Sequence, residues 1–149
     1  MAFIDVVTLV EAKAYLRVDD GFTADDSLIT LLINVAGDYI ERYTNHLLYA
    51  RDKTYQFYDG GVRVYDYPIN SQVSADTVES EVLSLYTFYE GDDEVTLNVG
   101  YAVVDVPPML KVKMLEVIDA MYNGNDNASV TNITNDLFES IAIYRRFMV

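Results

Sequence analysis

Residues 25–44 place the strongest constraint on the fold, because their apolar side chains recur at helical spacing. Successive apolar positions are three residues or one residue apart, which is the pattern of one continuous stripe along an α-helix. Thr23 or Asp25 is placed to cap this helix, and Asp25 and Asp26 suit its positive N-terminal end. The segment is therefore predicted to be a helix with one buried face, formed by Leu28, Leu31, Leu32, Val35, Ala36, Tyr39, Ile40 and Tyr43.

Three more helices are predicted from caps and periodicity. Thr8 opens a T-x-x-E capping box, which predicts a helix over residues 9–17. The double proline that starts at Pro107 suits the first turn of a helix over residues 109–122, because proline lacks only an N–H group that the first turn leaves unbonded. A last helix is predicted over residues 135–146, where two arginines suit its negative C-terminal end.

The middle of the chain changes to strand-like patterns. Residues 54–58 and 62–67 predict two strands that are joined by a tight D-G-G turn at residues 59–61. Residues 81–90 and 95–101 flank the short polar stretch G-D-D-E and predict a second hairpin. Both hairpins are local, so no parallel crossover connection is required.

The order of these elements predicts an α+β protein that is mainly α. Its expected form is a small bundle of four helices, with an antiparallel β-hairpin region inserted between the second and third helices. The length suits a single domain over residues 1–149 with its own core. The helical part is expected over residues 1–50 and 105–149, and the β insertion over residues 51–104.

Composition excludes several classes of protein. The formal net charge of −14 argues against wrapping nucleic acid, because neutralising phosphates requires Lys and Arg. There is no cysteine, which excludes disulfides and thiolate metal sites. No apolar run approaches the roughly 20 residues that span a bilayer, and no basic region precedes the first apolar residues, so synthesis in a cytoplasm is expected. The 13 tyrosines suit either a protein interface or the edges of a core.

The residues that carry chemistry do not combine into a recognisable catalytic motif. His46 is the single histidine, and no serine or cysteine near it in sequence forms a nucleophile–base pair. Aspartate clusters at residues 19–20, 25–26 and 92–94 suit a hard cation, but none has EF-hand spacing, and each also suits a helix end or a turn. Nucleotide-binding motifs are absent. We therefore predict no catalytic, cofactor-binding or metal-binding residues and no enzymatic activity.

Several phrases of the chain, in order, resemble the tailed-phage head–tail connector family, the gp6-like adaptor proteins. The first is T-L-V-E-A-K-A-Y-L-R-V-D-D at residues 8–20, and the second is D-D-S-L-I followed by A-G-D-Y-I-E-R-Y-T within residues 25–44. Shorter matches are Y-P-I at 67–69, G-Y at 100–101, V-P-P-M-L-K at 106–111 and the final Y-R-R. The chain departs from the family in its tyrosine-rich strands and in residues 70–80, which are expected to form a polar loop.

The resemblance implies a structural role in the neck of a virion. Such adaptors form a homo-oligomeric ring, commonly of twelve copies, beneath the portal protein, and the ring continues the DNA channel without specific DNA binding. A stopper or tail-completion protein attaches to the other side of the ring. The family's C-terminal segment contacts the portal, which implies a portal-docking group formed by Ile141, Tyr144, Arg145, Arg146 and Phe147.

Other interpretations of the same sequence stay open. An acidic mimic of DNA, or another protein-binding module, fits the composition and is expected to bind a basic protein in a salt-sensitive way. A metal-dependent enzyme built on the aspartate clusters is a further alternative. The basic and apolar end of the chain is also explained without a partner, since two arginines at a helix end are stabilised by the helix dipole alone.

Overall fold

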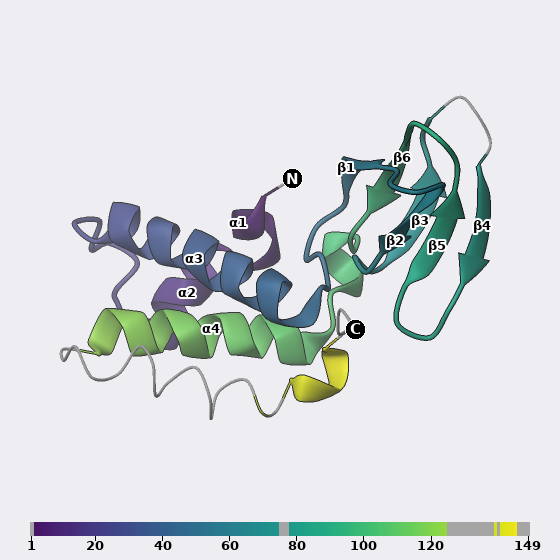
Figure 1. Ribbon diagram of the computed structural model, residues 1–149. Helices are drawn as coiled ribbons and strands as arrows, with labels where there is room; N and C mark the ends of the chain where they lie inside the picture. Colours follow the sequence, from purple (N-terminus) through teal and green to yellow (C-terminus); the bar gives the residue numbers. More distant parts are fainter. Residues whose placement is uncertain (1, 75–77, 125–138, 140, 146–149) are drawn as a thin grey trace.

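The computed structural model describes residues 2–74, 78–124, 139 and 141–145. Figure 1 shows two lobes side by side: the helical lobe, which contains the four α-helices, and the β lobe, which contains the six strands. The helices are α1 Phe3–Val6, α2 Leu9–Leu16, α3 Asp26–Thr44 and α4 Pro108–Asn123, with 3-10 turns η1 Val103–Asp105 and η2 Ala142–Tyr144. The strands are β1 Arg51–Gln56, β2 Gly61–Val64, β3 Ile69–Gln72, β4 Glu79–Val82, β5 Thr87–Glu90 and β6 Glu94–Val99.

The capping box predicted at the start of α2 is present. The Thr8 hydroxyl accepts a hydrogen bond from the Glu11 N–H at 3.2 Å, and the Glu11 carboxylate accepts one from the Thr8 N–H at 2.7 Å. The bond from the Thr8 backbone is the main reason that the pKa of Glu11 is lowered. The helix ends at Arg17, whose φ of 60° is the left-handed conformation common after a helix.

Helix α3 is confirmed, but its buried face is rotated from the predicted stripe. Ile29 and Ile33, which the predicted stripe left out, are fully buried, whereas Leu28, Leu31 and Tyr39 are exposed. The segment is apolar around most of its circumference, so periodicity alone does not decide which face turns inward. The neighbours decide it: α3 packs on α4, α2 and α1 through Ile29, Leu32, Ile33, Ala36, Gly37 and Ile40.

The loop between α2 and α3 is held by a buried lysine. Lys13 is 3% exposed, and its ammonium group donates to the carbonyl oxygens of Asp20 and Phe22 at 2.9 and 2.8 Å. The same group forms an ion pair with Asp26 at 2.9 Å. Asp25 occupies the predicted cap position, but its side chain makes no cap hydrogen bond and instead accepts one from the Tyr122 hydroxyl at 2.5 Å.

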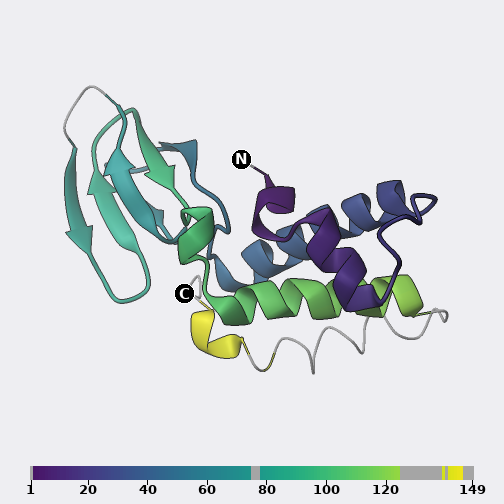
Figure 2. The same ribbon diagram turned by 180° about the vertical axis from the view of Figure 1, so that it is seen from behind.

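The helical lobe has one core that all four helices share. Figure 2 shows α1 and α2 on the reverse side of the α3–α4 pair. The core includes Val6 from α1, Leu16 from α2, Ile33 from α3 and Met114 from α4, and Ile141 near the C-terminus joins them. None of the described helices combines the length and the apolar character that a membrane crossing requires.

The β lobe is antiparallel as predicted, but of the pairings between its described strands only that of β4 with β5 is a local hairpin. One sheet has the order β1-β6-β3 and the other the order β2-β5-β4, so β1 pairs with β6 and not with β2. The segment 81–90, predicted as one strand, is the end of β4, a turn and β5; the Leu83 N–H donates to the Tyr86 carbonyl at 2.9 Å across that turn. The expected loop at 70–80 contains most of β3 and the start of β4.

The fold class α+β is confirmed, while the predicted place of the strands is wrong. The strands follow the third helix, α3, and do not lie between the second and third helices. The cause is α1, which the sequence did not predict because it is only four residues long. The last helix predicted over 135–146 lies mostly outside the described residues, and the described part includes the 3-10 turn Ala142–Tyr144.

Candidate functional site: the C-terminal turn and the joint beneath it

The C-terminal turn places the predicted docking residues in two different environments. Ile141 has no exposed surface and belongs to the helical core, so it anchors the turn. Tyr144 is half-buried with its ring edge against His46, and the exposed Arg145 guanidinium lies 4.9 Å from the centre of the Tyr43 ring. Arg146 and Phe147 lie outside the described residues. Figures 1 and 2 show this turn at the N-terminal end of α4, on the side toward the β lobe.

Two segments of the chain connect the lobes, residues 45–50 and residues 100–107; we call them together the joint. They are hydrogen-bonded to each other, since the Tyr101 N–H donates to the Leu47 carbonyl at 3.0 Å. Gly100 lies at a close approach of the two segments: its φ is +108°, and a Cβ there would lie 2.2 Å from the Tyr49 carbonyl oxygen. Only glycine fits this position without displacing the neighbouring backbone.

An aromatic cluster surrounds His46 at the joint. His46 is 7% exposed, and its Nδ1 lies 2.8 Å from the Tyr101 hydroxyl. The rings of Tyr67, Tyr101 and Tyr144 lie 4.9, 5.9 and 5.6 Å from the His46 ring, measured between centroids. No partner of His46 was predicted from the sequence; the structure places it where the β lobe, the joint and the C-terminal turn meet.

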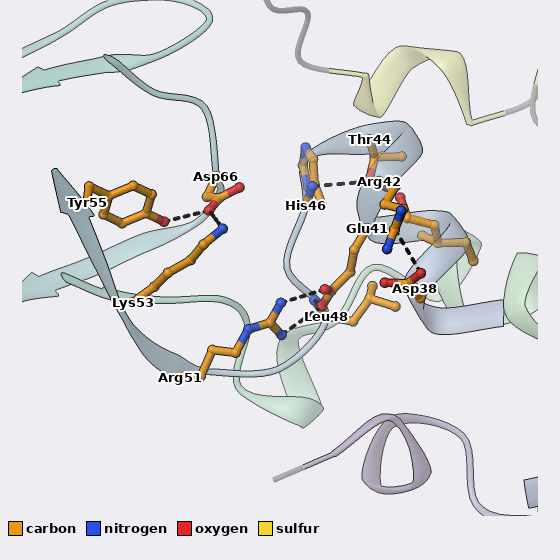
Figure 3. A network of polar contacts seen from close by, with 11 residues as sticks. Asp38, Glu41, Arg42, Thr44, His46, Leu48, Arg51, Lys53, Tyr55 and Asp66 are labelled. Atoms are coloured by element: carbon orange, nitrogen blue, oxygen red, sulfur yellow. Dashed lines mark hydrogen bonds and ion pairs between the residues drawn. The ribbon is translucent and has the colours of Figure 1, made fainter. Parts of the chain in front are cut away.

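A charged network fastens the end of α3 to the start of the β lobe (Figure 3). Glu41 is 8% exposed, and its carboxylate accepts hydrogen bonds from the Leu48 N–H at 2.8 Å and from both terminal nitrogens of Arg51 at 3.0 and 2.6 Å. The hydrogen bond to Glu41 is the main reason that the pKa of Arg51 is raised. No local motif signals this pair, because its members are ten residues apart on different elements.

A second polar contact lies inside the β lobe. The Asp66 carboxylate accepts hydrogen bonds from Lys53 and from the Tyr55 hydroxyl, both at 2.5 Å (Figure 3). Burial, and then the bond to Asp66, raises the pKa of Tyr55. This contact joins β1 to the segment after β2, so it fixes the two sheets relative to each other.

The described aspartates at residues 19, 25 and 26 each make a separate contact. Asp19 accepts a hydrogen bond from the Gly21 N–H at 2.8 Å, Asp26 pairs with Lys13, and Asp25 binds Tyr122. In the part of the chain that the structure describes, no three histidine or acidic side chains gather as ligands for a metal ion. Their observed contacts are structural.

Fold and site together define a two-lobed α+β protein, with the lobes hydrogen-bonded at a joint and a C-terminal turn anchored beside that joint. The chain belongs to the phage gp6-like head-tail connector protein family, whose model matches residues 6–143. The protein is therefore a structural component of the neck of a phage-like particle, where head and tail join. Its family is one of structural connectors and not of enzymes.

Two solved structures share the fold along the whole chain. One is described as "Neck of empty GTA particle computed with C6 symmetry", with a TM-score of 0.78, 14% sequence identity and coverage of 100% of this chain and 94% of that chain. The other is described as "Virion of native gene transfer agent (GTA) particle", with a TM-score of 0.76, 13% identity and the same coverage. A comparison with curated protein sequences found no match.

Proposed function

We propose that this connector assembles into a homo-oligomeric ring of twelve copies beneath the portal protein, with a stopper or tail-completion protein on the other side. Membership of the head–tail connector family is the observation that carries this proposal. The similar neck chain comes from a particle computed with sixfold symmetry, and a sixfold axis accommodates twelve copies as two per repeat.

The outer face of α3 is the surface that we assign to contact between neighbouring copies. Leu28, Leu31 and Tyr39 are 47%, 57% and 38% exposed, and with Val35 they form one apolar stripe at spacings of three and four residues. A helix that is apolar on both faces is stable in water only when both are covered. A second copy covers this stripe in the proposed ring, with a different patch of its own, as the head-to-tail contacts of a ring require.

The C-terminal turn is the surface that we assign to the portal. Ile141 fixes the turn to the helical core, and Tyr144 and Arg145 follow it at the surface. Arg146 and Phe147 continue the same basic and apolar segment in sequence. In a protein with a net charge of −14, this basic segment suits an acidic partner surface.

The same acidity suits a channel for DNA. Twelve copies at −14 each carry a formal charge of about −168, and a channel wall that carries part of it repels phosphates, so the duplex passes without specific binding. Neutralising the carboxylates that face the channel is expected to slow the passage of DNA while the ring stays intact. Unchanged DNA release from such particles would contradict this role.

We treat residues 1–149 as one adaptor domain, with the helical part over 1–50 and 105–149 and the β insertion over 51–104. The contacts of Glu41 with Arg51 and of His46 with Tyr101 support this, because each joins the two parts. Limited proteolysis tests it: a single domain resists cleavage between the parts, and release of a stable β fragment would contradict it.

Native mass spectrometry and negative-stain images of the purified protein, alone and mixed with its portal protein, test the ring. A particle of about twelve subunits, either free or formed only on the portal, supports the proposal. A monomer that ignores the portal and binds basic proteins in a salt-sensitive way would instead favour the acidic mimic.

A further inference from the structure

A groove in the β lobe lies between one edge strand of each sheet. Strand β3 ends the first sheet and β4 ends the second. Both strands line one groove of about 400 Å³, whose remaining lining includes the side chains of Thr87 and Tyr89 on β5. All four residues of β4 are exposed, and Val82 is 80% exposed. The groove therefore lies beside a free strand edge.

The hydrogen bonds between β4 and β5 determine which backbone groups of β4 face this edge. Bonded and non-bonded pairs alternate along an antiparallel ladder. The Leu83 N–H donates to the Tyr86 carbonyl, so Leu83 and Tyr86 are a hydrogen-bonded pair of the ladder. Glu81 and Phe88, two residues further from the turn on each strand, are therefore also a hydrogen-bonded pair. The pairs that lie between are non-bonded, so the N–H and C=O groups of Ser80 and Val82 point away from β5. Ser80 and Val82 are also the two β4 residues that line the groove.

The other face of β4 carries the acidic side chains of this strand, Glu79 and Glu81. Glu79 lies directly opposite Glu90 in the β4–β5 register, and like charges in that position are destabilising. Among the described residues, Glu79, Glu81 and Glu90 take part in no ion pair. A strand added beside β4 therefore meets carboxylates on one face, and on the other face the groove with Val82 and Tyr89.

We propose that the β4 edge is an acceptor for an extended segment of a partner protein, in which basic and apolar residues alternate. The backbone of that segment pairs with the outward groups of Ser80 and Val82, its basic side chains lie next to Glu79 and Glu81, and its apolar side chains enter the groove. Both views show β4 at the end of the molecule farthest from the helices, so this site is separate from the one assigned to the C-terminal turn. The acceptor site does not depend on ring formation.

Edge strands also carry glutamates simply to prevent unwanted pairing, and the test separates the two roles. The probe is a synthetic amidated hexapeptide, Lys-Val-Lys-Val-Lys-Val, added to the full-length protein while amide hydrogen exchange is followed by NMR. The expected result is slower exchange at Ser80 and Val82, with little change at Glu81, whose N–H already bonds to β5. The matched control is the same peptide with glutamate in place of lysine, which is expected to leave all three amides unchanged.

If the lysine peptide does not slow amide exchange at Ser80 and Val82, the proposal is overturned. The glutamates of β4 then serve only to prevent unwanted strand pairing. Variants provide a second measurement. Ser80→Pro removes one outward N–H and is expected to weaken binding about fivefold, the factor for one hydrogen bond, while Ser80→Ala keeps that N–H and binds normally. Glu79→Gln with Glu81→Gln is expected to weaken binding and to reduce its dependence on salt. Equal binding by Ser80→Pro and Ser80→Ala would contradict backbone pairing.

Discussion

Glu41 and Arg51 form a two-bond ion pair that joins the last turn of α3 to the first residue of β1. The Glu41 side chain is 8% exposed and the Arg51 side chain 29%, so the pair is largely withdrawn from water. The same carboxylate also accepts the Leu48 N–H, which fixes the joint between its two ends. One buried acid therefore sets how the β lobe is attached to the helices, and with it the spacing between the surfaces assigned above.

Replacing Glu41 with glutamine should destabilise the protein more than the loss of an exposed ion pair does. The change leaves the Arg51 guanidinium without its anion in a largely buried place, and we expect a loss of about 2–4 kcal/mol in the free energy of unfolding. Arg42→Ala is the control, because it breaks the exposed Asp38–Arg42 pair, which is worth less than about 0.5 kcal/mol. Urea unfolding measures the free energy of unfolding of both variants. Equal losses of stability would show that burial of the Glu41–Arg51 pair adds nothing to its contribution.

Charging the outer stripe of α3 should prevent assembly without unfolding the subunit. Leu28→Glu with Leu31→Glu places two carboxylates on the assigned contact surface, and because both positions are exposed we expect a change in stability within about 0.5 kcal/mol. Native mass spectrometry is expected to show monomers. The neighbouring control Ile29→Ala removes a fully buried side chain and is expected to cost about 2–5 kcal/mol while leaving assembly of the folded protein intact. A ring formed by the doubly charged variant would rule out this face.

Reversing the charge at Arg145 should reduce binding to the portal with little effect on folding. Arg145→Glu removes an exposed cation–π contact with Tyr43, which is worth about 0.5–1 kcal/mol. The matched control is Arg63→Glu, which removes a contact of the same kind with Tyr86 on the β lobe. A pull-down on portal protein should show a loss for the first variant only, and a similar result for both would locate portal binding elsewhere.

The capping box at α2 should add a pH-dependent part to stability. The pKa of Glu11 is lowered in the folded state, so its contribution is fully present above the unfolded value of about 4.3 and is lost as the pH falls through the folded value. Glu11→Gln should therefore be less stable than the natural protein at pH 7. The difference in the free energy of unfolding should shrink as the pH falls below the unfolded pKa of Glu11, as urea unfolding at pH 7 and pH 3 will measure. A constant difference at both values would assign the effect to packing.

Local signals were sufficient to locate α2, α3 and α4 and insufficient for α1 and the sheets. Thr8 and Glu11 predicted their own cap because they are three residues apart and need no other element. Strands β1 and β2 each paired with a strand far along the chain, for example Arg51 opposite Val99, so the turn motif at residues 59–61 predicted the wrong partner. The turn at Leu83–Tyr86 contains none of the usual glycine, proline or asparagine signals, and a hairpin was therefore taken for one strand.

The sequence predicted which segment forms the candidate docking site, but not how its residues are arranged. The segment from Ile141 onward was singled out by resemblance, but its division into a buried anchor and an exposed arginine required the structure. Lys13 and Glu41 were missed for one physical reason: charged residues on helices are expected to face water, and these two are withdrawn to satisfy backbone groups of neighbouring loops. The outer stripe of α3 was predicted as apolar, and only packing showed that Leu31 is outside the core.

The close approach at Gly100 also has a mechanical consequence. Two chain segments cross between the lobes side by side, and the missing side chain lets them press together and share a hydrogen bond between Tyr101 and Leu47. A pull on the β lobe is therefore divided between two covalent paths that brace each other, so tilting it must shear their contact instead of bending one free linker. A subunit with this joint is expected to resist bending between its two lobes when force is applied to one of them.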